Sequence, residues 1–183
     1  PTEIWAEEAE ETMPTNIWQG TTGAWSTAAN WSLAAVPVTG DTVIIPASAT
    51  VSITSGLTQD LVNLLAMIVE PDCTIDIGLV GTPLYITIRE LKYFGDGSLF
   101  YRNSSIADNA LYVDSFNKDD AVTMHTGSGS IAFLSLRSGK VVCDGTVGVS
   151  VAIVSPIHGR SGRAILTCGG TITRLVQTGG ESS

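Results

Sequence analysis

Histidine and cysteine are the residue types in this sequence that most readily act as catalysts or bind metal. The two histidines, His125 and His158, have no serine, cysteine or carboxylate beside them in the arrangement of a catalytic triad. The three cysteines, Cys73, Cys143 and Cys168, have no Cys-x-x-Cys spacing and no histidine at ligand spacing. We interpret His125 as a strand residue and the cysteines as small buried hydrophobic residues. We therefore expect no triad and no metal site.

Carboxylate pairs are the other arrangement that can do chemistry, because enzymes that cleave glycosidic bonds use two acids. The candidates are Asp72 with Asp76, Asp96, and Asp114 with Asp119 and Asp120. They lie beside Gly, Pro or Asn, where an Asp side chain commonly bonds to nearby backbone. We interpret them as turn residues and predict no catalytic residue and no enzyme. Phosphate-loop and dinucleotide motifs are absent from the sequence, so no cofactor is expected.

Charge is distributed unevenly along the chain, whose net charge is −9. Residues 1–88 contain ten acids and no Lys or Arg, whereas all nine basic residues lie from Arg89 onward. An acidic chain repels the nucleic acid backbone and anionic membranes. The sequence also lacks the run of about 18 apolar residues that a membrane span needs. We therefore expect neither nucleic acid binding nor membrane insertion.

Two charged segments are predicted to contact partners. One is an acidic arm at residues 1–16, and the other is the basic loop His158–Arg163. The predicted partner-binding residues are Trp5, Glu7, Glu8, Glu10, Glu11, Arg160 and Arg163. The basic loop is suited to an acidic surface, such as the first half of a neighbouring copy.

The chain is predicted to form one domain of β structure. It has 19 Gly and 15% charged residues, with many Val, Ile, Thr and Ser, which favours strands and tight turns. From Thr42 onward, β-rich runs such as Thr50–Ile53 and Thr74–Ile77 alternate with turns, and pairs of runs recur at about 17 to 25 residues. That spacing is the length of one coil of a parallel β-helix. The segment Thr58–Met67 also fits one turn of helix, because its leucines recur at helical spacing.

The segment from Ile17 to Ile53 carries a distinct order of residues. It contains Trp18, Gly20, Trp25, Asn30-Trp31-Ser32, Pro37, Gly40-Asp41, Thr42–Ile45 and Thr50–Ile53. This order resembles the opening of β-solenoid proteins of phage virions and of bacterial surface or autotransporter-like proteins, which begin W…G…W…NWS…P…GD-x-V-x-I.

The resemblance and the repeat together predict an all-β fold. We expect a short right-handed parallel β-helix of about five or six coils. The expected segments are the arm at 1–16, a Trp-rich cap at 17–41 and the solenoid at 42–183. A β-sandwich or jelly roll also has many short strands at regular spacing and is the alternative.

The function expected from this architecture is structural. We expect a phage virion protein, such as a head decoration, head fibre or tail-associated subunit, that aids attachment; its short length, its charged arm and the lack of a secretory signal in this sequence favour this role. The expected partners are other copies of itself, as a trimer, capsid or tail proteins, and a glycan of the host surface. The alternatives are a polysaccharide depolymerase of tailspike type and a fragment of a bacterial adhesin at the cell surface.

Overall fold

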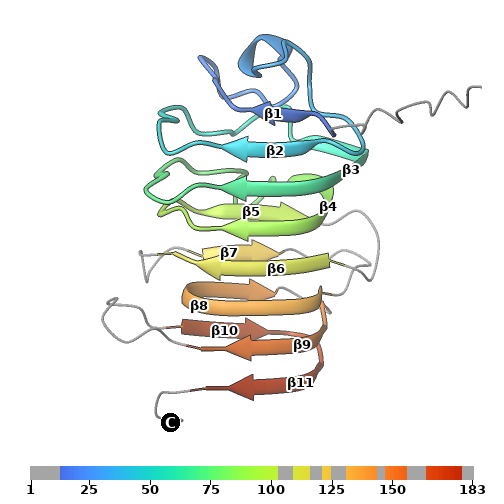
Figure 1. Ribbon diagram of the computed structural model, residues 1–183, viewed down its shortest axis with the longest axis vertical. Coiled ribbons are helices and arrows are strands. Elements are labelled where there is room, and N and C mark those ends of the chain that lie inside the picture. Colours follow the sequence, from blue (N-terminus) through green and yellow to red (C-terminus); the bar gives the residue numbers. More distant parts are fainter. Residues whose placement is uncertain are drawn as a thin grey trace, which may run out of the picture.

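The computed structural model describes residues 13–102, 109–115, 121–124, 131–143, 147–155 and 164–178. Within these residues the chain winds into a solenoid of about six turns, with strands stacked along one axis from β1 to β11 (Figure 1). The strands are β1 (Thr15–Ile17), β2 (Thr42–Ile45), β3 (Thr58–Val69), β4 (Leu84–Tyr93), β5 (Leu99–Arg102), β6 (Asn109–Asp114), β7 (Ala121–Met124), β8 (Ile131–Cys143), β9 (Val149–Val154), β10 (Ala164–Cys168) and β11 (Ile172–Gln177). Every pairing between these described strands is parallel. The predicted β-solenoid is confirmed, and the sandwich alternative, which requires antiparallel pairs, is wrong.

The strand register divides the coils into two faces. The first face contains β1, β2, the later parts of β3 and β4, β6, the first half of β8, β9 and β11. The second face contains β5, β7, the second half of β8 and β10. Strand β8 belongs to both faces because the chain turns a corner at Gly139, whose φ of 95° lies in the left-handed region that glycine adopts without strain.

Inward-facing residues in register form continuous columns through the core. One column runs through Val43, Met67, Leu91, Leu111, Leu134, Ala152 and Leu175. All of these except Leu175 are at most 2% exposed. The columns pack the apolar side chains of each coil against those of the coils above and below it.

The coil length agrees with the repeat predicted from the sequence. The backbone N–H of Asp76 donates to Ser52 Oγ on the preceding coil, 24 residues away. The N–H of Ser98 on the following coil donates to Asp76 Oδ1, 22 residues away. Both separations lie within the range of about 17 to 25 residues. The weak repeat in the sequence therefore corresponds to the number of residues in one coil.

A cluster of tryptophans covers the first coil, as the sequence predicts. Trp31 makes edge contacts with Trp18, at 5.0 Å between ring centroids, and with Trp25, at 4.7 Å. Its indole N–H donates to the backbone oxygen of Trp25 at 2.7 Å. The three side chains are at most 2% exposed. The cap is thus a packed apolar cluster, and Gly20 is required in it because a Cβ there would overlap the ring of Trp18.

Asn30 of the Asn-Trp-Ser motif holds the loop of this cap together. It ends a short 3-10 helix, Ala28–Asn30, and its side chain is 1% exposed. Its Nδ2 lies 3.0 Å from the backbone oxygen of Thr22, 2.9 Å from Thr22 Oγ1 and 2.8 Å from the backbone oxygen of Ala24. Its Oδ1 accepts from the N–H groups of Thr21 and Thr22. One buried amide therefore satisfies the polar groups of a loop that has few backbone partners.

The helical turn considered for Thr58–Met67 is wrong. These residues belong to β3, which pairs with β2 and β4 on its two sides. Leu61 falls where the register shifts between Thr58 and Asn63, and its side chain is 90% exposed, whereas Leu64 is fully buried. Pairing with two neighbouring strands outweighs the small helical preference of leucine.

Two other expectations change in detail. The predicted strands Thr50–Ile53 and Thr74–Ile77 are irregular, and the strand pairing between them is limited to an isolated parallel bridge between Ile53 and Ile77. Thr15 and Asn16, assigned to the arm, belong to β1, where Asn16 is 1% exposed and donates to the backbone oxygen of Ala35 at 2.8 Å. The boundary between arm and cap therefore lies before Thr15. Among the described residues, no helix has the length and apolar character to cross a membrane.

Candidate functional site

The predicted partner-binding residues cannot be placed in the fold. Trp5, the four glutamates from Glu7 to Glu11, Arg160 and Arg163 lie outside the described residues. The same is true of both histidines and of Asp119 and Asp120. The contacts proposed for the acidic arm and the basic loop therefore stay predictions.

Of the four described candidate aspartates, Asp72 lies in a turn and Asp96 in a bend, as the sequence predicts, whereas Asp76 and Asp114 bond to groups on neighbouring coils. Asp72 lies in a turn with φ of 64°, in the left-handed region. Asp76 links two coils through the N–H of Ser98, and the N–H of Asp96 donates to the backbone oxygen of Cys73 at 2.7 Å. Asp114 ends β6, and its Oδ1 lies 2.7 Å from the hydroxyl of the buried Ser138. The carboxylates of Asp76 and Asp114 therefore bond one coil to the next.

The cysteines pack as the sequence predicts in two of three cases. Cys73 and Cys143 are buried, and burial raises the pKa of both thiols, that of Cys143 to about 12. Cys168 lies in register with Cys143 on the next coil and is half-buried, with its Sγ donating to the backbone oxygen of Val147 at 3.1 Å. Cys168 is more exposed because it belongs to the last coil. The described residues contain no group of three or more His, Cys, Asp or Glu side chains placed to hold a metal ion.

That last coil presents its apolar side chains to solvent. Leu175 is in register with the fully buried Ala152, yet it is 56% exposed. Leu166, which pairs with the buried Val141, and Ile172 are also only partly buried. We call the inward-facing residues Leu166, Cys168, Ile172 and Leu175 the open end. Continuing the core columns past this coil requires another layer of side chains.

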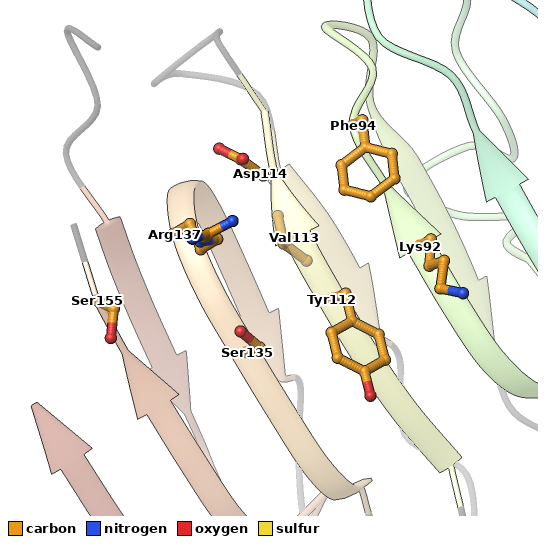
Figure 2. Close-up of a pocket in the computed structure, with 8 residues that line it drawn as sticks. All are labelled: Lys92, Phe94, Tyr112, Val113, Asp114, Ser135, Arg137 and Ser155. Carbon is orange, nitrogen blue, oxygen red and sulfur yellow. The ribbon is translucent and has the colours of Figure 1, made fainter. Parts of the chain in front are cut away.

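A groove on the first face gathers polar and aromatic side chains from successive coils. It has a volume of about 410 Å³ and is lined by Lys92, Phe94, Tyr112, Val113, Asp114, Ser135, Arg137 and Ser155. Figure 2 shows these residues on four neighbouring segments of chain, with the rings of Phe94 and Tyr112 on adjacent strands and the guanidinium of Arg137 directed toward the side of Asp114. This size is within the range of small-ligand sites.

The register sets how the groove residues are arranged. Lys92, Tyr112 and Ser135 are successive partners in β4, β6 and β8. Arg137 is placed beside Asp114 by an irregularity, because Val113 pairs with Leu136 while Asp114 pairs with Ser138. The extra residue of this bulge, Arg137, is exposed.

Sequence reasoning did not find the groove. Its residues come from four coils and form no local motif. The alternation of inward and outward residues would have placed Lys92 and Tyr112 on the outside of their strands. Their proximity, however, depends on the register between strands, which cannot be read from the sequence. No protein-family model, curated protein or solved structure matches this chain.

Proposed function

We propose that this chain is a non-enzymatic structural protein of a phage virion, displayed on the particle surface as a head decoration, head fibre or tail-associated subunit. In this proposal it assembles with other copies of itself, as a trimer or larger assembly, through the open end. The observation that carries the proposal is Leu175, a core-column residue that remains 56% exposed on the last coil.

The open end has the chemistry of an interface. It combines half-exposed aliphatic side chains with the outer edges of β10 and β11, which have one described strand neighbour each. Strand edges with unpaired N–H and C=O groups readily pair with another chain. A partner that covers this end removes apolar surface from water and satisfies the free backbone groups in one step.

The charge distribution favours copies of the same chain meeting at this end. Residues 1–88 carry all the excess negative charge, whereas the half that contains the open end has nine basic residues against eight acids. Copies that approach through their C-terminal coils avoid the repulsion between their acidic halves. A side-by-side arrangement of the N-terminal coils has no such advantage.

Sedimentation analysis of the purified chain tests this assembly. The wild-type protein is expected to sediment as a trimer or larger species, and Leu175→Glu as a monomer with an unchanged β-type circular dichroism spectrum. Leu61→Glu is the matched control, because Leu61 is 90% exposed on the side of the solenoid. A wild-type protein that stays monomeric at high concentration would show that the open end does not assemble copies.

The virion role needs its own experiment. Antibodies against the chain are expected to label the surface of phage particles in electron micrographs, and its gene is expected among capsid and tail genes. Recovery from the cell envelope, with export genes beside it, would favour the adhesin alternative. Release of reducing sugar ends from host polysaccharide by the purified chain would favour the depolymerase alternative.

A further inference from the structure

The groove on the first face is independent of the open end, since it lies on the side of the solenoid between β4 and β9. Its floor consists of strands that are already paired on both sides, β6 with β4 and β8, and β8 with β6 and β9. A peptide cannot add here as a further strand, because the backbone groups are used. Any ligand must therefore be recognised by side chains.

The aromatic groups of the groove offer flat apolar surfaces at fixed positions. Tyr112 and Phe94 are both half-exposed. The ring of Tyr112 also packs against Phe133 at 5.6 Å between centroids, which holds its orientation. Neighbouring coils are about 4.8 Å apart, which is close to the length of one sugar unit. Rings of this kind suit the C–H faces of a saccharide, which are apolar while the rim of the sugar is polar.

Two basic side chains of the groove, Lys92 and Arg137, can bind anionic groups of a ligand, and Asp114 lines the groove with them. Arg137 is exposed and has no ion pair with another described residue. Lys92 Nζ lies 3.1 Å from Glu90 Oε2, and both side chains are 38% exposed, so this pair is hydrated and adaptable. Lys92 on β4 and Arg137 on β8 lie on opposite sides of β6. They can therefore bind the carboxylates of two different sugar units, and the planar guanidinium of Arg137 suits a carboxylate well. The hydroxyls of Ser135 and Ser155 and the carboxylate of Asp114 supply the donors and acceptors that sugar hydroxyls need.

We propose that this groove binds a short segment of an acidic glycan, a chain of sugars that carry carboxylates. In this arrangement Tyr112 and Phe94 stack on sugar rings, and Arg137 and Lys92 each bind the carboxylate of a different sugar unit. Ser135, Ser155 and Asp114 bond sugar hydroxyls.

Calorimetric titration with defined oligosaccharides tests this site on the full chain. The probes are a hexamer of galacturonic acid and a hexamer of sialic acid, and the neutral controls are methyl-esterified galacturonate hexamer and maltohexaose. At least one acidic hexamer is expected to bind, more weakly as salt is raised, while the neutral controls bind at least tenfold more weakly. The titration is repeated on Leu175→Glu, so that failure of assembly and failure of glycan binding are separate results.

Three variants assign the binding to the groove. Arg137→Ala is expected to weaken binding roughly tenfold, the effect of one charge-assisted hydrogen bond. Tyr112→Ala is expected to weaken binding of the acidic hexamer, and Tyr112→Phe to retain it. Arg102→Ala is the matched charge control, because Arg102 stacks on Tyr85 at 5.1 Å, away from the groove. Failure of both acidic hexamers to bind, or binding that survives both Arg137→Ala and Tyr112→Ala, would overturn the proposal.

Discussion

The two ends of the solenoid differ in how well their apolar side chains are covered. At the N-terminal end Trp18, Trp25 and Trp31 are at most 2% exposed and cover the first coil, whereas at the C-terminal end Leu175 is 56% exposed. Among the described residues, a buried tryptophan cluster covers the first coil, whereas the last described coil has no comparable cluster. The difference teaches that the strands of this fold supply stacking, while closure is a separate property that depends on a few large side chains.

The largest expected effect on stability comes from removing a tryptophan of the cap. Trp31→Ala removes the ring that contacts both other tryptophans, and it should lower the free energy of unfolding by about 3–5 kcal/mol. Leu175→Ala, at the end of a core column, should cost at most about 1 kcal/mol because this side chain is already half-exposed. Urea denaturation at a dilution where the chain is monomeric measures both. Equal losses for the two variants would mean that the ends do not differ in burial.

A smaller effect tests whether the cap depends on its hydrogen bonds as well as its rings. Asn30→Asp keeps the size of the side chain but removes donation to the oxygens of Thr22 and Ala24, and should cost about 2–3 kcal/mol. Gln59→Glu is the matched control, because Gln59 is partly exposed and donates only to the backbone oxygen of Gly56. Similar midpoints for Asn30→Asp and the wild type would show that the rings alone close this end.

The loss of stability at alkaline pH can be used to compare the burial of cysteine thiols near the two ends. A thiol whose pKa is raised by folding is stabilising below its unfolded pKa, and the stability is lost as pH rises toward the folded pKa. For Cys143 this range runs from 9.0 to about 12. Stability should fall by about 1 kcal/mol near pH 10 on account of this group, and Cys143→Ala should reduce the fall.

Cys73, nearer the closed end, gives the matching measurement. Burial raises the pKa of its thiol as well, so Cys73→Ala should also flatten the alkaline limb. Stability is followed by urea denaturation of each variant across the alkaline range. If Cys143→Ala leaves the pH dependence unchanged while Cys73→Ala reduces it, the coils near the open end are less firmly packed than their burial indicates.

The smallest expected effect concerns the residues before the cap. Because β1 begins at Thr15, deletion of residues 1–12 should leave the melting temperature nearly unchanged. The same deletion should reduce incorporation of the chain into particles, if the acidic arm binds a partner. Differential scanning calorimetry and a particle-binding assay measure the two properties. A collapse of folding would place the arm within the closed end.

The sequence predicts those parts of the molecule that depend on local composition. The tryptophans of the cap, the Gly40-Asp41 turn and the recurring apolar runs all indicate a capped solenoid, and the described residues have these features, with Trp18, Trp25 and Trp31 in the cap. Local composition did not distinguish Thr50–Ile53 from a regular strand, because β-branched residues favour extended backbone whether or not a neighbour pairs with it.

The parts that could not be predicted depend on register. Coil lengths vary, so Glu90 pairs with Ala110 and Ala110 with Phe133 at unequal separations. A difference of one residue reverses which side chains face outward. The groove depends on the register, because a bulge places Arg137 beside Asp114 and no residue pattern predicts that bulge.

The tryptophan cap also limits the number of ends through which one molecule can contact another along the solenoid axis. A solenoid with two open ends is bivalent, and head-to-tail contacts between such molecules elongate into filaments without a natural limit. Here Trp18, Trp25 and Trp31 cover one end, so the assembly that we propose uses the open end alone. If copies meet only through that end, growth along the axis stops at this contact and the assembly is finite in size.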